Sequence, residues 1–272
     1  MAFPPVVHDV VESVRFGRVL FAEIVPPPAT GERCRYCAGL VSAERGAPRR
    51  AHFSDPGACV RAILTPLDRG AAVDAVVLGG AGEPMRHRGI GAILRRLRGQ
   101  AHLGAVVLTT GAELRDRDIR REAAEAGLVV VWMPALEDRS EGDDAYERER
   151  AFERHVEAVA SLRRDTTVPI ALELAIRPGL NDGKRSREAW LHAAERIRPD
   201  RLFIVPAPGA VERELPQALE DMRAAFPRAA GAFLDDGTIV DRRCFCGVTE
   251  ETDVDEAIEA DAADDGSAAP DA

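Results

Sequence analysis

The chain has 272 residues, of which 46% are hydrophobic and 30% are charged. This composition is typical of a soluble globular protein and argues against a disordered chain. No apolar run approaches the ~20 residues that cross a bilayer, which excludes an integral membrane protein. The start, MAFPPVVHDVVE, lacks the basic region and long apolar core of a signal peptide. We therefore expect a cytoplasmic protein.

The net charge of −10 is concentrated at one end of the sequence. Residues 250–272 contain ten Asp or Glu and no Lys or Arg, so the rest of the chain is close to neutral. We expect one folded domain over residues 1–248 and a disordered acidic tail over 249–272, acting mainly as a solubility segment. A near-neutral domain lacks the clustered positive charge that phosphates attract, so nucleic acid is not an expected partner. A protein partner stays open.

Short apolar segments alternate with amphipathic ones along the chain. The expected strands are residues 19–25, 75–78, 105–108, 128–133, 170–176 and 202–205. The expected helices are a segment starting at Ser54-Asp55-Pro56, then 90–97, 115–126, 144–164, 186–197 and 215–226, before a hairpin over 232–234 and 238–240. Apolar strands separated by helices predict a parallel α/β sheet. Six units favour a partial (β/α)6-type barrel, with a doubly wound sheet as the alternative, and in both folds ligands bind at the carboxyl ends of the strands.

The five cysteines form two close pairs and one single residue. Cys34 and Cys37 follow the first expected strand, and a Cys-x-x-Cys pair there suits a metal, a cluster or a redox role. Cys244 and Cys246 make a second pair, and four thiolates together would close a zinc or iron–sulfur site. Cys59 lies on the apolar face of a helix and is expected in the core.

Small and polar residues follow three other expected strands. The segments are Gly79-Gly80-Ala81-Gly82-Glu83-Pro84, Thr109-Thr110-Gly111, and Arg177-Pro178-Gly179-Leu180-Asn181-Asp182. Glycines allow a close approach of the backbone to a ligand, and Glu83 offers an acceptor for a cationic group. Glu173, inside an apolar strand, is expected either to face the site or to pair with an arginine. His87 is expected in a solvated loop, His155 and His192 to satisfy local hydrogen bonds, and Trp132 in the core.

Taken in order, these motifs resemble the radical S-adenosylmethionine (SAM) superfamily, and most closely the wyosine-synthetase-like iron–sulfur oxidoreductases, over about residues 16–205. Cys34-Arg35-Tyr36-Cys37 looks like the second half of the family's cysteine motif. Gly80 to Pro84 is similar to the loop that holds the amino group of SAM, Thr110 stands where the family often has Asn, and Asn181 falls in a similar turn. The cofactor-binding residues that the resemblance implies are Tyr36, Gly80, Gly82, Glu83, Pro84, Thr110 and Asn181.

The sequence departs from the family at Thr30, where the first of three motif cysteines would stand. In the family, three thiolates hold a [4Fe–4S] cluster whose open iron binds SAM, and a neutral hydroxyl is a poor substitute for a thiolate. Three hypotheses follow. Cys244 or Cys246 supplies the third ligand; all four cysteines bind zinc or a closed cluster; or the chain is a scaffold without a metal.

The first hypothesis implies radical-based modification of an unidentified substrate, with a [4Fe–4S] cluster and SAM as cofactors. The near-neutral charge argues against tRNA as that substrate. The other two imply a non-catalytic protein with structural zinc, a closed cluster or no metal. We expect Cys34 and Cys37 as metal ligands, with Cys244 and Cys246 as candidates to complete the set.

Overall fold

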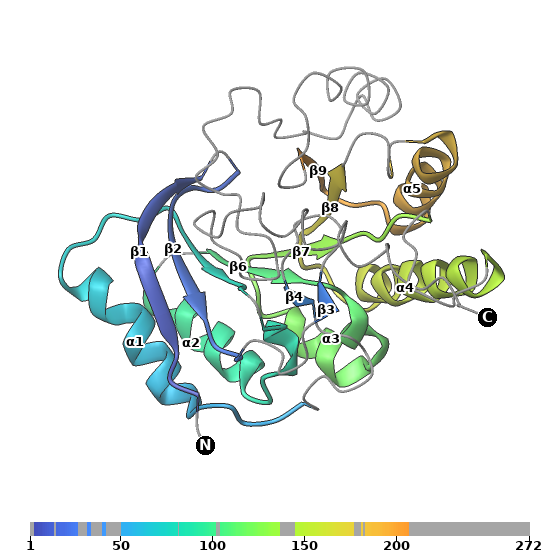
Figure 1. Cartoon of the computed structure of the whole chain (residues 1–272). Coiled ribbons are helices and arrows are strands. Elements are labelled where there is room, and N and C mark those ends of the chain that lie inside the picture. The colour runs from blue at the N-terminus through green and yellow to red at the C-terminus, as the bar shows by residue number, and fades with distance from the viewer. Residues whose placement is uncertain are drawn as a thin grey trace, which may run out of the picture.

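The computed structural model describes residues 3–13, 15–26, 32–33, 40–41, 50–80, 82–101, 104–136, 145–176, 181 and 183–206 (Figure 1). Its main feature is a seven-stranded sheet in the order β1-β2-β5-β6-β7-β8-β9. These strands are β1 (Val6–Ser13), β2 (Gly17–Glu23), β5 (Ala75–Leu78), β6 (Gly104–Thr109), β7 (Leu128–Trp132), β8 (Ile170–Ile176) and β9 (Arg201–Pro206). From β2 onward each strand pairs in parallel with the next. Within this sheet, β1 alone is antiparallel to its neighbour.

Helices connect the parallel strands. The α-helices are α1 (Pro56–Asp68), α2 (Ile90–Ala101), α3 (Arg117–Ala123), α4 (Ala145–Asp165) and α5 (Lys184–Ile197), and two short 3-10 helices are η1 (Pro84–Arg86) and η2 (Ala112–Arg115). Successive α-helices are neighbours in space, from α1 beside α2 to α4 beside α5. Figure 1 shows α1, α2 and α3 along one side of the sheet, with α4 and α5 continuing the series toward β9. A parallel sheet whose strands follow chain order requires this one-sided layer, because its crossovers share one hand.

Two apolar clusters lie on opposite faces of the sheet. The larger cluster joins buried helix residues such as Ile63, Leu94 and Val159 to every second strand residue. The alternate strand residues, including Phe21, Val106 and Phe203, form a smaller cluster to which the described helices contribute nothing. The side chains of a strand alternate between faces, so the second cluster marks the face that the helices leave uncovered. No described helix is long and apolar enough to cross a membrane.

The expected α/β fold with six parallel strands is confirmed, and two expected strands, 75–78 and 170–176, have the predicted limits. Whether the sheet curves into a barrel stays a prediction. The helix expected over 115–126 is shorter because Asp116 ends η2 and caps α3, accepting a hydrogen bond from the Asp118 N–H at 2.7 Å. The helix expected over 215–226, the final hairpin and the acidic tail lie outside the described residues.

Three strands of the structure are not predicted from the sequence. One is β1, in which the polar pair His8-Asp9 falls at an irregularity between Val7 and Val10 and interrupts the apolar alternation. The others are β3 (Glu32–Arg33) and β4 (Leu40–Val41), two residues each, which pair on either side of the Cys34–Cys37 segment. Strands this short carry no periodic signal.

Candidate functional site

Glu83 joins the loop after β5 to the loop after β6. Its Oε1 accepts hydrogen bonds from the Met85 N–H at 3.0 Å and the Thr109 hydroxyl at 2.8 Å. Its Oε2 accepts from the N–H and the hydroxyl of Thr110, both at 2.8 Å. Each oxygen therefore has two donors, and the side chain is largely buried. The predicted residues Glu83, Pro84 and Thr110 thus come together at the carboxyl edge of the sheet, as the sequence indicated.

Two glycines bring this loop against the end of β2. A Cβ on Gly82 would lie 2.3 Å from the Val25 carbonyl oxygen and 2.5 Å from that of Pro26, so only glycine fits this approach. Gly80 has a φ of +107°, and a Cβ there would lie 2.4 Å from the Glu23 carboxyl carbon. The chain enters the segment containing the first cysteine pair directly after Pro26. The loop predicted to hold SAM therefore stands beside the start of the predicted cluster segment.

Sequence reasoning missed an acidic side chain at this edge, Glu23 at the end of β2. Its Oε1 lies 2.9 Å from Nε2 of His8 on β1, and both side chains are partly exposed. The His8 ring also contacts Phe21, with ring centres 5.6 Å apart. The sequence does contain a signal for Glu23, because a carboxyl group at the end of an otherwise apolar strand is typical of a site residue. It contains no such signal for His8, because the strand that carries His8 was not predicted.

A buried ion pair lies farther along the helix-free face. Arg15, in the turn between β1 and β2, pairs with Glu173 of β8, and their side chains are 3% and 9% exposed. The guanidinium stands 5.0 Å from the ring centre of Phe16 and 5.6 Å from that of Phe203. Of the two expectations for Glu173, pairing with an arginine is therefore confirmed. The pair compensates both charges within an apolar cluster.

Behind the Thr109–Gly111 loop lies the imidazole of His155 from α4. A Cβ on Gly111, whose φ is +78°, would lie 2.8 Å from His155 Cε1. Burial lowers the pKa of His155 to about 4. A hydrogen bond with the Trp132 backbone has the opposite, smaller effect on this pKa. Its Nε2 has no hydrogen-bond partner among the described residues. The local hydrogen bond expected of His155 is therefore the one with the Trp132 backbone.

The other candidate residues lie in contacts that stabilise the fold. Asn181 is buried and donates to the Ala175 carbonyl oxygen at 2.8 Å, which ties the turn after β8 to its strand. His87 is fully buried, not solvated, because the Gly89 N–H donates to its Nδ1 and Ser54 contacts its Nε2. Cys59 is confirmed in the core. Trp132 is half-buried at the end of β7, where the alternation of the strand directs it to the helix-free face.

The predicted metal ligands lie outside the described residues. This applies to Cys34, Cys37, Cys244 and Cys246, and also to Thr30 and Tyr36. Within the described part of the chain, no group of three or more His, Cys, Asp or Glu side chains is arranged to hold a metal ion. Both the metal set and its third ligand stay predictions.

The residues present fit the implied cofactors only in part. The glycine-rich loop, its position and its close backbone contacts suit a cofactor at the carboxyl edge. The Glu83 carboxylate fits less well, because an ammonium group would have to share an oxygen that already accepts two hydrogen bonds. The adjacent cysteine motif offers two thiolates and Thr30 in place of a third.

Comparison with known proteins supports the fold. No protein-family model matches this chain. It is similar to a radical SAM methyltransferase from Sphaerobacter thermophilus whose crystal structure is known, with a TM-score of 0.56 and 16% identity. The match covers 79% of this chain and 65% of that one, so the chain spans just under two thirds of the methyltransferase. At this identity the likeness shows a radical-SAM-like fold.

A second similarity points to a protein of different description. The chain is 24% identical over 212 residues to a GTPase Obg from Brachyspira hyodysenteriae, which covers 78% of this chain and 31% of that protein. It therefore spans about a third of that relative. A P-loop reads Gly-x-x-x-x-Gly-Lys-Ser/Thr. The chain's only lysine, Lys184, is followed by Arg185, and Pro178 stands in place of the first glycine, so this chain has no P-loop.

Proposed function

We propose that this chain is a radical-SAM-type protein that binds an iron–sulfur cluster through Cys34 and Cys37, and SAM at the loops after β5 and β6. The supporting observation is the contact of Gly82 with the carbonyl groups of Val25 and Pro26. It supports the proposal because the loop after β5 lies against the chain that leads into the cysteine segment. The radical-SAM-like fold supports the same assignment.

In this proposal each part of the chain has a separate task. Cys34 and Cys37 hold two irons as thiolates, and Cys244 or Cys246 replaces the ligand that Thr30 does not provide. Glu83 holds the two loops in position through Met85, Thr109 and Thr110. When bound, the cluster and SAM supply the reductive chemistry typical of the family. The substrate is unidentified, and the near-neutral body favours one other than nucleic acid.

The second candidate is a non-catalytic scaffold of the same fold. Thr30 favours it, since the motif lacks a thiolate, and so does the Glu83 carboxylate, since its oxygens already accept four hydrogen bonds. In this form, Cys34, Cys37, Cys244 and Cys246 would close a structural zinc or cluster site with no open position, or no metal would bind.

Metal analysis and electron paramagnetic resonance (EPR) separate the two candidates. The full chain is purified without oxygen, reconstituted with iron and sulfide, and analysed for iron, sulfide and zinc. We expect about four irons per chain and an EPR signal of the reduced protein that changes when SAM is added. Cys34→Ala and Cys37→Ala should each lose most of the iron.

Cys59→Ala is the matched control. It removes a buried thiol that lies 2.9 Å from the Ser54 hydroxyl and belongs to the α1 core, so its iron content should equal that of the natural chain. Stoichiometric zinc, or no metal after reconstitution, would contradict the cluster proposal and favour the scaffold. A full cluster whose signal ignores SAM would favour a closed site.

A further inference from the structure

On the helix side of the molecule, arginines line an open groove of about 500 Å³. Arg115 and Arg120 come from η2 and α3, Arg154 from α4 and Arg196 from α5. Glu153 and Glu157 of α4 also line it. Its ionisable lining therefore consists of four guanidinium groups and two carboxylates.

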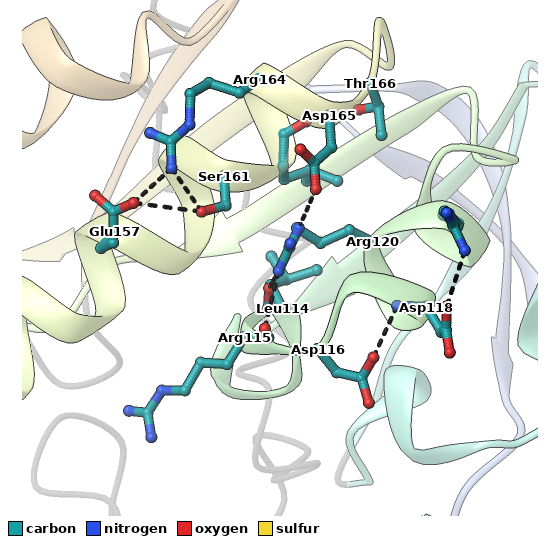
Figure 2. A network of polar contacts seen from close by, with 12 residues as sticks. Leu114, Arg115, Asp116, Asp118, Arg120, Glu157, Ser161, Arg164, Asp165 and Thr166 are labelled. Carbon is teal, nitrogen blue, oxygen red and sulfur yellow. Dashed lines mark hydrogen bonds and ion pairs between the residues drawn. The ribbon is translucent and has the colours of Figure 1, made fainter.

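Two of the four arginines are held by carboxylates. Arg120 donates through Nε to Asp165 at 2.8 Å, and through Nη1 to the carbonyl oxygens of Leu114 and Arg115 at 2.8 and 2.9 Å (Figure 2). Arg196 donates to Glu153 at 2.6 Å and to Glu157 at 2.9 Å. Glu157 also accepts from Arg164. The charged partners of Arg120 and Arg196 are therefore all carboxylates.

The other two arginines, Arg115 and Arg154, are exposed and have no carboxylate partner among the described residues. Figure 2 shows the Arg115 side chain pointing away from the network, while its carbonyl group is held by Arg120. The groove therefore combines paired arginines with two arginines, one on η2 and one on α4, that have no carboxylate partner in the described part of the chain. This leaves it an excess of positive charge in a chain whose overall charge is −10.

The excess of positive charge in this groove favours an anionic ligand. Its two arginines without a carboxylate partner among the described residues come from separate elements, Arg115 from η2 and Arg154 from α4. A single phosphate suits guanidinium groups that converge on one point. An acidic peptide instead offers several carboxylates, so that each guanidinium group can pair with a different one.

We infer that the acidic segment of this same chain, residues 250–265, docks in the arginine groove. This segment contains nine Asp or Glu and no Lys or Arg. Forty-four positions separate Pro206 from Glu250, which at up to ~3.5 Å each do not limit its reach across a domain of this size. Single exposed ion pairs are weak, but tethering gives an effective concentration in the millimolar range, so several weak pairs suffice.

The chain's lysine content allows a direct test by carbodiimide coupling, which joins amines to carboxylates in contact. Lys184, on α5, is the only lysine in the sequence. Arg115→Lys and Arg154→Lys therefore each place a new amine on one wall of the groove of the full chain. Arg69→Lys, at the end of α1, places an equally exposed amine elsewhere and is the matched control.

We expect both groove variants to couple to carboxylates within residues 250–265, in products of monomer mass, at least about ten-fold more than the control. Because salt screens exposed charges, 0.5 M NaCl should abolish this excess. Equal coupling in all three variants would overturn the proposal. Products of dimer mass would assign the groove to a second copy. If inorganic phosphate, added at unchanged ionic strength, removes the excess of the groove variants over the Arg69→Lys control, the groove is a phosphate site.

Discussion

His155 makes the stability of the fold depend on pH. Burial lowers its pKa to about 4, while in the unfolded chain it titrates near the ordinary value of 6.5. Above pH 6.5 both states are neutral and the contribution is complete. As pH falls from 6.5 to 4 the unfolded chain takes up the proton first, so about 3 kcal/mol of stability is lost.

His155→Phe should remove most of this loss, measured by urea unfolding at pH 7 and pH 4. His192→Gln, an exposed histidine on the neighbouring helix α5, is the control and should leave the difference unchanged. Burial also lowers the pKa of His87, which adds a smaller dependence of the same sign in every variant. Identical pH differences for the natural chain and His155→Phe would contradict the assignment.

The Arg15–Glu173 pair should show the cost of an uncompensated charge in the helix-free face. Arg15→Met leaves the Glu173 carboxylate among apolar side chains, and we expect a loss of about 3–5 kcal/mol in the free energy of unfolding. Arg15→Met combined with Glu173→Leu should recover much of it. The exposed pair of Arg121 and Asp118 is the control, since Arg121→Met should cost less than about 1 kcal/mol. Equal losses at both sites would contradict this account.

Among the elements, the loop after β5 has a tight steric requirement at Gly82. Gly82→Ala would force a methyl group to 2.3 Å from the Val25 carbonyl oxygen, so the loop must move away from β2. We expect weaker SAM binding by calorimetry and a lower free energy of unfolding. Gly99→Ala is the control, because Gly99 is exposed in α2 with nothing within 4 Å of its added Cβ. It should stabilise the chain by up to about 1 kcal/mol.

The elements that sequence predicted best are those whose pattern is local. Val76 and Val77, or Leu172 and Leu174, belong to apolar runs bounded by turn residues, and such runs identify buried parallel strands without tertiary information. The edge strand β1 escaped because it is partly exposed and interrupted at His8 and Asp9. Its assignment depends on pairing with β2, which is not a property of either segment alone.

The candidate site, like the secondary structure, was predictable where its signal is local in sequence. Position after a strand correctly brought Glu83 and Thr110 to one edge. The hydrogen bonds that occupy the Glu83 carboxylate, and the ion pair that joins Arg15 to Glu173 across 158 positions, depend on contacts distant in sequence. A motif can state which residue types gather at a site, but not which of their atoms are already engaged there.

For the whole molecule, the question is whether the sheet edge and the distant cysteines form one metal site. If Cys244 or Cys246 replaces the ligand missing at Thr30, then Cys244→Ala combined with Cys246→Ala should lose most of the iron in the natural chain. Thr30→Cys restores the three-thiolate motif with Cys34 and Cys37. Adding it to the double variant should return the iron content and the SAM-dependent EPR signal.

The four chains, with and without each change, make a cycle that tests the third ligand separately from the presence of a cluster. Iron that survives Cys244→Ala and Cys246→Ala in the natural chain would contradict a ligand from that pair. Failure of Thr30→Cys to restore iron would contradict the family motif. Thr30 lies four residues after Pro26, whose carbonyl group is close to Gly82 in the loop after β5. A thiol at position 30 would complete the motif with Cys34 and Cys37, so the cluster would then need no ligand from Cys244 or Cys246. Rescue at this position alone would therefore place the complete cluster motif at the carboxyl edge of the sheet.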